Sequence, residues 1–482
     1  MSKSRSKGNN KVIVRCVGKS AEEVTGSAYL VDTGQEKILI DCGIYQSNNL
    51  LEDYRINNRK FDFKPSELTA VLVTHCHMDH LGLVCRLVKE GFNSNIYMNY
   101  KILDFCEPML MDCAKIMSRD ALLLSKKSGQ TVNPIYTESD VTETLSRFRG
   151  IKHGEEVKIS DNITAVFCNA GHIFASSQIS LYIKTESGNV KKLSFSGDLG
   201  NTLLKQPFCE KFEPIVKTNV MFGETTYNSS DRSIKKGQRE KDLEKLESII
   251  RETCLEKKGK CLIPSFALGR VQSMLYYIYQ IFGSDPTFKI PVVIDSPLAV
   301  KLTRCYEDNL SEEEDGLLFS EILQWKNLRI IESYEESATL IKDESPKVIL
   351  SSSGMLTQGR SILHLQDILP RKNSHIILCG FMAPGTIGYK IKNDKYDEIK
   401  VNGKYYKNNA SITALTSFSS HMQYEQLQSY YLSLANNGCS TIVLVHGDEG
   451  KIKFKKALEE KISKIGKTTK VIAATKDQVV RI

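Results

Sequence analysis

The chain has 482 residues and a net charge of +8, with 41% hydrophobic and 25% charged residues. This composition is that of a globular protein and excludes a disordered or fibrous chain, and the length indicates two or more domains. The sequence contains no run of 18 apolar residues, and Met1–Lys11 lacks the apolar segment of a signal peptide, so we expect neither a membrane protein nor a secreted one.

Thirteen cysteines are spread through the chain without a C-x-x-C pair. Their odd number and irregular spacing argue against a disulfide framework and favour a reducing compartment. We therefore expect a cytoplasmic protein that does not contact a membrane.

The first informative strand is predicted over Lys37–Asp41, where an apolar run ends in a carboxylate. A carboxylate at this place can orient a metal-binding histidine by a hydrogen bond, or it can simply begin a turn. The polar stretch Tyr45–Phe63 has little periodicity and predicts a loop.

The next apolar run, Leu68–Val73, predicts a buried strand and leads directly into the densest group of metal-binding residue types. Residues two apart at a strand end point the same way, so His75 and His77 can bind one metal ion from one side. Asp79 and His80 follow where the chain should turn into a helix, and they can face a second ion.

Imidazole and carboxylate groups are ligands that suit zinc. Histidines on a polar surface turn would explain a lone H-x-H pair. They explain the full H-x-H-x-D-H pattern of residues 75–80 much less well.

Two later strands also end in candidate ligands. The predicted strand over Thr164–Ala170 runs into His172, and the strand over Leu193–Ser196 runs into Asp198. A single histidine or aspartate at a strand end carries little information by itself.

Strands and helices then alternate from Lys260 to about Gly380, after a charged amphipathic helix predicted over residues 237–256. Predicted strands cover residues 261–264, 291–295, 347–350 and 374–379. Repeated strand–turn–helix units imply a parallel sheet flanked by helices. The Gly- and Ser-rich turns can bind phosphate through backbone N–H groups, or they can merely cap helices.

Near the end of the chain, the segment Ser417–His421 ends in a histidine, and a predicted strand over Ile442–Val445 runs into His446. The stretch Lys451–Lys470 has eight lysines and two glutamates. It is suited to binding a polyanion, and it is equally typical of a solvated helix face.

The pattern T-H-x-H-x-D-H at residues 74–80 resembles the signature of the metallo-β-lactamase superfamily. Glu224-Thr-Thr-Tyr resembles motif A of its nuclease branch, the β-CASP subfamily, while Ser417–His421 resembles motif B and His446 resembles motif C. Met422-Gln423 stands where motif B usually continues with Ala-Asp. Segments typical of the inserted β-CASP domain are P-S-F-A-L-G-R-V-Q, D-S-P-L-A and S-S-S-G-M-L-T-Q-G-R, at residues 264–272, 295–299 and 351–360.

The resemblance implies an α/β fold, a metallo-β-lactamase αββα sandwich interrupted by a β-CASP domain with a parallel sheet flanked by helices. We expect residues 1–207 to form the first part of the sandwich, 208–410 the insert, and 411–482 the return segment with motifs B and C. The chain resembles the endonuclease subunit of the pre-mRNA 3′-end cleavage machinery and its compact prokaryotic relatives.

The resemblance also implies a set of site residues. Two zinc ions would be held, one by His75, His77, His172 and Asp198, the other by Asp79, His80, Asp198 and His446. His421 would act as general acid and Glu224 would orient it, while Asp79 and Asp41 complete the catalytic group. Substrate contacts are expected from Arg270, Ser352, Ser353 and Gly354.

The expected function is that of a zinc-dependent ribonuclease, which cuts single-stranded RNA mainly internally, with a 5′–3′ exonuclease activity as a further option. His446 favours RNA, because DNA-repair members tend to carry valine there. Alternatives are a DNA nuclease of the same fold, an RNA-binding scaffold subunit that needs a partner, and a small-molecule ester hydrolase that leaves the insert unexplained. A homodimer is compatible with the resemblance.

Overall fold

The computed structural model describes residues 12–47, 49–185, 187–310, 314–380, 382–383, 385–393 and 396–482, apart from the side chains of Arg232 and Glu314. The polar stretch Met1–Lys11 lies outside these residues. The chain divides into two compact units. The first contains the chain up to Leu203, Glu210–Ser233 and His421–Ile482, and the second contains Leu204–Cys209 and Ile234–Ser420.

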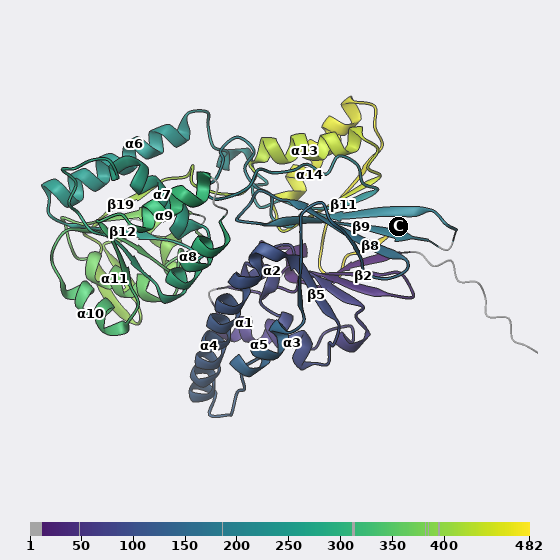
Figure 1. Cartoon of the computed structure of the whole chain (residues 1–482), viewed down its shortest axis with the longest axis horizontal. Helices are drawn as coiled ribbons and strands as arrows, with labels where there is room; N and C mark the ends of the chain where they lie inside the picture. The colour runs from purple at the N-terminus through teal and green to yellow at the C-terminus, as the bar shows by residue number, and fades with distance from the viewer. Residues whose placement is uncertain are drawn as a thin grey trace, which may run out of the picture. The chain divides into compact units, whose positions relative to one another are not determined.

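The first unit is built on two seven-stranded sheets (Figure 1). One has the order β22-β1-β2-β3-β4-β5-β6, with β1 Ile13–Cys16, β2 Tyr29–Asp32, β3 Lys37–Ile40, β4 Ala70–Leu72, β5 Asn95–Asn99, β6 Phe148–Ile151 and β22 Val479–Arg481. The other has the order β21-β20-β11-β10-β9-β8-β7, with β7 Glu156–Lys158, β8 Ile163–Asn169, β9 Ser177–Lys184, β10 Val190–Phe195, β11 Val220–Glu224, β20 Thr441–Val445 and β21 Lys470–Ala473.

The core of this unit lies between the two sheets. Alternate residues of β8 point inward, so that Ile163, Ala165 and Phe167 are buried while their neighbours are partly exposed. The stacked rings of Phe195 and Phe222 have their centroids 4.9 Å apart and belong to the same buried cluster. Burial of these apolar faces is the main force that holds the sheets together.

Helices cover the outer face of each sheet (Figure 1). Those beside the first sheet are α1 Leu50–Asn57, α2 Met78–Leu81, α3 Val84–Lys89, α4 Leu103–Ser128 and α5 Glu138–Leu145. Those on the second sheet are α13 Tyr424–Asn436 and α14 Lys451–Lys464, whose apolar residues form a cluster with those of β20 and β21. Short 3₁₀ turns cover Lys19–Ala21, Pro65–Glu67, Tyr100–Ile102 and Ser230–Arg232. This arrangement confirms the predicted αββα sandwich.

The second unit contains a six-stranded sheet with the order β14-β13-β15-β12-β16-β19, and its neighbouring strands are all parallel. Its strands are β12 Lys260–Pro264, β13 Val292–Asp295, β14 Leu328–Ile331, β15 Lys347–Ser351, β16 His375–Leu378 and β19 Ser411–Ala414, and a hairpin joins β17 Glu398–Val401 to β18 Lys404–Lys407. Its helices are α6 Gln238–Ile250, a π-helical turn Arg251–Glu256, α7 Arg270–Phe282, α8 Pro297–Asn309, α9 Glu314–Leu323, α10 Tyr334–Lys342, α11 Arg360–Ile368 and α12 Ile387–Asn393. The predicted parallel sheet is thereby confirmed.

Two features differ from the sequence expectations. The stretch expected to be a loop contains α1, because the Asn49 side chain accepts hydrogen bonds from two N–H groups of the first turn. The segment 210–233, placed in the insert from the sequence, packs in the first unit, because β11 pairs with β10 and β20. The exact limits of the insert, expected at 208 and 410, stay a proposal. No helix of the described residues is long and apolar enough to cross a membrane.

Candidate metal centre

The candidate ligands all lie in the first unit, at the ends of strands from both sheets. His75 and His77 follow β4, and Asp79 and His80 lie in α2 directly behind them. His172 follows β8, Asp198 follows β10 and His446 follows β20. Five short segments, which span most of the sequence, therefore converge on one place.

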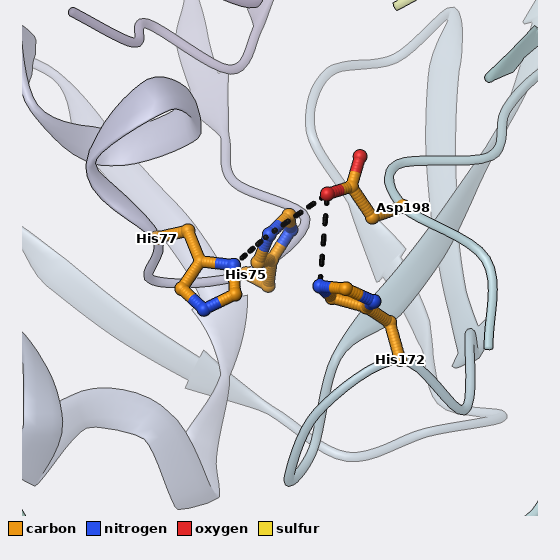
Figure 2. A group of neighbouring side chains, drawn as sticks. All are labelled: His75, His77, His172 and Asp198. Atoms are coloured by element: carbon orange, nitrogen blue, oxygen red, sulfur yellow. Dashed lines mark hydrogen bonds and ion pairs between the residues drawn. The ribbon is translucent and has the colours of Figure 1, made fainter. Parts of the chain in front are cut away.

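One group of side chains consists of His75, His77, His172 and Asp198 (Figure 2), and its ligand atoms all lie within 4.8 Å of one another. Oδ2 of Asp198 is 3.7 Å from Nε2 of His75 and 3.6 Å from Nε2 of His172. Nε2 of His75 is 3.1 Å from Nδ1 of His77. Three imidazole nitrogens and a carboxylate oxygen thus face a common centre.

A second group consists of Asp79, His80 and His446. Oδ2 of Asp79 is 3.3 Å from Nε2 of His446 and 3.8 Å from Nε2 of His80. His80 and His446 are buried, while the Asp79 side chain is 24% exposed. This group therefore has a side that solvent can reach.

Asp198 lies between the two groups. Its Oδ2 faces the first group, while its Oδ1 is 3.3 Å from both Nε2 of His80 and Nδ1 of His446. The side chain is only 3% exposed. A carboxylate in this position can serve both groups at once.

The protonation state of the three histidines in the first group favours metal binding. Burial lowers the pKa of His75 and of His172 well below the ordinary value, and burial likewise lowers the pKa of His77. These rings are therefore neutral, and a neutral imidazole is the form that binds a metal ion. Five histidines and two aspartates make up the donor set, which fits zinc.

Asp41 is in neither ligand group, but it hydrogen-bonds to Thr74 and His80 of the centre. It is 1% exposed, and its carboxylate accepts hydrogen bonds from the backbone N–H of Thr74, at 2.8 Å, and from the Thr74 hydroxyl, at 2.9 Å. Nδ1 of His80 lies 2.7 Å from Oδ2 of Asp41. Asp41 therefore directs Nε2 of His80 towards the ligand groups, as a carboxylate behind a metal-binding histidine does.

His421 and Glu224 form a pair beside the first group. Nδ1 of His421 is 3.2 Å from Oε1 of Glu224, and the rings of His421 and His172 have their centroids 4.4 Å apart. Glu224 is fully buried and also accepts hydrogen bonds from the backbone N–H groups of Leu199 and Thr226. Burial opposes a charge on His421, but the hydrogen bond to Glu224 and the negative charges of Glu224, Asp198 and Asp79 together outweigh it and raise the pKa of His421.

Sequence reasoning missed two threonines that contact ligand candidates. The Thr226 hydroxyl is 3.1 Å from Nδ1 of His446, and the Thr74 hydroxyl is 3.1 Å from Nδ1 of His75. Both residues lie inside the motifs described above. Each stands two residues after the end of a buried strand, and this position was the available signal.

One glycine allows a close approach that the centre needs. A Cβ on Gly43 would lie 1.7 Å from the carbonyl oxygen of Asp79. The backbone N–H of Cys42 donates to the carbonyl of His80 at 2.8 Å, so the segment after β3 runs directly against α2. Any side chain at position 43 would push Asp79 and His80 out of place.

The unusual residues after motif B have their own contacts. Met422 is buried in the cluster of α13 and α14. Gln423 donates from Nε2 to the carbonyl oxygen of His421, at 2.9 Å. An amide therefore fixes the backbone of His421 where the usual motif has a carboxylate.

The residues expected to contact substrate lie in the second unit and form a group of their own. Arg270 begins α7, and Ser352, Ser353 and Gly354 follow β15. Oγ of Ser352 is 2.6 Å from Oγ of Ser296, and a Cβ on Gly354 would lie 2.9 Å from the backbone nitrogen of Phe266. The turns after β12, β13 and β15 therefore meet at the carboxyl edge of the parallel sheet, where such sheets bind ligands.

Three family profiles match the chain. Residues 21–142 match the metallo-beta-lactamase superfamily, residues 271–391 match the Beta-Casp domain, and residues 405–472 match the Zn-dependent metallo-hydrolase RNA specificity domain. The three matches cover the ligand motif, the central part of the second unit and the return segment with His446.

Curated proteins and solved structures give further matches. The chain is 30% identical over 445 residues to Ribonuclease TTHA0252 of Thermus thermophilus, covering 90% of this chain and 93% of that protein. It is 30% identical over 447 residues to Transcription termination factor FttA of Methanocaldococcus jannaschii, covering 89% of this chain and 66% of that protein. A crystal structure of a protein of unknown function from Enterococcus faecalis has a TM-score of 0.50 at 12% identity, covering 98% of this chain and 100% of that one, which is a likeness of fold alone.

Proposed function

Because the chain belongs to the metallo-β-lactamase superfamily, in its β-CASP branch, we propose that it is a zinc-dependent ribonuclease. It cuts phosphodiester bonds of single-stranded RNA, mainly within the strand, and leaves 5′-phosphate and 3′-hydroxyl ends. Removal of nucleotides from a 5′ end is a second activity that the same residues would serve.

The position of Asp198 between two groups of ligand side chains is the observation that best supports this proposal. Both of its carboxylate oxygens face imidazole nitrogens, at 3.3 to 3.7 Å. We infer from this that the centre holds two zinc ions, one in each group, with Asp198 shared. Bound zinc would supply an acidified water molecule and would neutralise charge on the phosphoryl oxygens.

The residues of the chain itself do the remaining work. Glu224 accepts a hydrogen bond from Nδ1–H of His421, so Nε2 is the nitrogen that gives a proton to the leaving 3′ oxygen. The raised pKa of His421 keeps this ring protonated closer to neutral pH. Water attacks phosphorus and releases one proton to solvent, the P–O3′ bond breaks, and the proton from His421 completes the 3′-hydroxyl group.

RNA is the favoured substrate for three reasons. A profile described as an RNA specificity domain matches residues 405–472, and the relative from Thermus thermophilus is named a ribonuclease. His446 also completes the second ligand group, where DNA-repair members of the family tend to carry valine.

The test compares a 5′-labelled single-stranded RNA with the DNA of the same sequence, using zinc-loaded protein. We expect internal cuts in RNA and little or no cutting of DNA. The double variant Asp79→Ala/His80→Ala should lose the activity, because it removes two of the three residues of the second group. Cutting of DNA at an equal rate would favour a DNA nuclease, and intact RNA in the presence of full zinc would favour a scaffold that needs a partner.

A further inference from the structure

His421 is the first residue of the first unit after a long excursion of the chain through the second. The residues just before it, Ser417, Phe418 and Ser419, belong to the second unit and are all buried. The backbone of this segment therefore enters the centre from a unit that contributes none of the ligand candidates. Only Ser420 separates this buried segment from His421.

Two residues of α6 hold the backbone of Ser417. The carboxylate of Asp242 accepts a hydrogen bond from its N–H at 2.9 Å. The guanidinium of Arg239 donates twice to its carbonyl oxygen, from Nε at 3.0 Å and from a terminal nitrogen at 2.6 Å. Both side chains are at least nine-tenths buried, so these charge-assisted bonds compete little with water.

Arg239 also fixes the next residue. Its guanidinium carbon lies 5.2 Å from the ring centre of Phe418 and 5.1 Å from that of Tyr277, whose hydroxyl accepts a further hydrogen bond from it. The two rings also contact each other, with their centroids 5.1 Å apart. A cation beside aromatic rings in a desolvated place is a favourable contact. Phe418 therefore has little freedom to move.

A third residue, Gln206, holds Ser419. Its Nε2 donates to the carbonyl oxygen of Ser419 at 3.1 Å, and the side chain is 5% exposed. Oε1 of Gln206 is buried and accepts no hydrogen bond from the described residues. The hydrogen bond of this buried amide is therefore made by its NH₂ group, which binds the backbone two residues before His421.

Within the first unit, the segment that contains Leu199 and Gly200 runs next to the segment that begins at His421. Gly200 and His421 form an antiparallel bridge, and the N–H of Met422 donates to the carbonyl of Leu199 at 2.7 Å. Leu199 directly follows Asp198, and its N–H donates to Glu224 at 2.9 Å. A shift of either segment would therefore alter the distance from His421 to Glu224 and to Asp198.

We propose that Arg239, Asp242 and Gln206 form a clamp, a set of positioning residues that act through the backbone of Ser417–Ser419 to place His421 for proton transfer. This inference rests on the proposed function, in which His421 gives a proton to the leaving 3′ oxygen. The clamp touches no reacting atom. Its effect is on the step that needs the acid, because a misplacement of about 1 Å can cost roughly a hundredfold in rate.

The experiment separates this step from all others by changing the leaving group. The oxygen substrate is an RNA oligonucleotide whose cleavage site has been mapped with the wild-type protein. The sulfur substrate carries a 3′-S-phosphorothiolate at that site. When its P–S3′ bond breaks, the thiolate leaves without a proton, since a thiol has a pKa of about 8.5. A misplaced acid therefore slows cutting of the oxygen substrate alone.

The variants are Gln206→Met and Arg239→Lys, which remove or reduce the hydrogen bonds to the segment, with His421→Ala as reference. The control is Arg251→Lys, an arginine in the turn after α6 that pairs with Glu247 and Asp285 and not with the segment. Thermal unfolding and zinc content show whether each variant is folded and loaded. Gln206→Met is the mildest change, because it removes one hydrogen bond and keeps the shape of the side chain.

We expect both clamp variants to lower kcat on the oxygen substrate by about tenfold to a hundredfold at unchanged KM. On the sulfur substrate they should match wild type, as His421→Ala should, and Arg251→Lys should match wild type on both. Equal losses on the two substrates, or no loss on either, would overturn the clamp. Absence of selective rescue in His421→Ala would instead refute the acid role of His421, and a wild-type protein that cuts neither substrate would refute the proposed function.

Discussion

Nε2 of His446 lies 3.3 Å from Oδ2 of Asp79, although 367 positions separate the two residues in the sequence. The contact exists because β20 pairs with β11 in the second sheet, while β4 leads to Asp79 from the first sheet. The candidate metal centre is thus a product of the whole sandwich. Its predicted properties can be tested one side chain at a time.

The first prediction concerns the number of zinc ions. We expect about two per wild-type chain and about one in His446→Ala, because the second group loses one of its three residues while the first keeps all four. The zinc content of each purified protein is measured by elemental mass spectrometry. His375→Gln, which changes a histidine of the second unit, is the control and should keep both ions. Loss of both ions in His446→Ala would mean that the two groups do not bind independently.

The second prediction concerns His421. Its replacement by alanine should lower kcat on RNA by about a hundredfold to ten-thousandfold, which is the usual contribution of a general acid. The zinc content should stay unchanged, because His421 is in neither ligand group. Steady-state kinetics and elemental analysis on the same preparation check both halves. A variant with normal zinc and normal kcat would remove His421 from the mechanism.

The third prediction concerns Asp41. Asp41→Asn should weaken zinc binding about tenfold to a hundredfold, as loss of a group behind a ligand commonly does. The Asp41 carboxylate accepts hydrogen bonds from the N–H and the hydroxyl of Thr74 and also contacts Nδ1 of His80. An asparagine would have to point its NH₂ group, which cannot accept a hydrogen bond, at one of these partners. Competition with a chromogenic chelator measures the affinity. An unchanged affinity would show that Thr74 alone keeps His80 in place.

The fourth prediction is a pH dependence in the second unit. Burial lowers the pKa of His375 from 6.5 to about 4. The unfolded chain therefore takes up a proton near pH 6.5 that the folded chain refuses until about pH 4, so the stability that His375 provides is present above pH 6.5 and is lost as the pH falls to 4. Urea unfolding of wild type and His375→Gln across this range gives the difference in free energy of unfolding.

The free energy of unfolding of the wild-type protein should fall relative to that of His375→Gln as the pH falls below 6.5. Above pH 6.5 the difference between the two proteins should be constant. The comparison removes the titration of the other histidines, which both proteins share. Gln can keep the hydrogen bond that Nε2 of His375 makes with the Thr413 hydroxyl at 2.9 Å. Curves that stay parallel down to pH 4 would contradict the prediction.

Local patterns of the sequence were sufficient for much of this structure. The apolar run before Thr74 and the spacing of His75, His77 and His80 predicted a metal-binding turn after a buried strand, and the turn lies there. The repeated strand–turn–helix pattern predicted a parallel sheet, since each of the four predicted strands is a nearly continuous buried run. Strands β14 and β19 went unpredicted because they are edge strands with half-exposed residues.

Contacts between distant segments could not be read from any pattern. The grouping of His172, Asp198 and His446 with the turn rested on the resemblance to a family. Nothing in the spacing of α6 indicates that Arg239 binds the carbonyl of Ser417, 178 positions away. Such contacts follow from the tertiary fold, in which the pairing of strands far apart in sequence decides the neighbours.

The return of the chain to the first unit has a consequence for its synthesis on the ribosome. His446 is made last of the seven ligand candidates, and β20 must pair with β11 before His446 can reach Asp79. At about 5–20 residues per second, the other six ligands wait many seconds for it. A nascent chain therefore carries an incomplete centre until nearly all of this sequence has been translated. Its activity can begin only after that point.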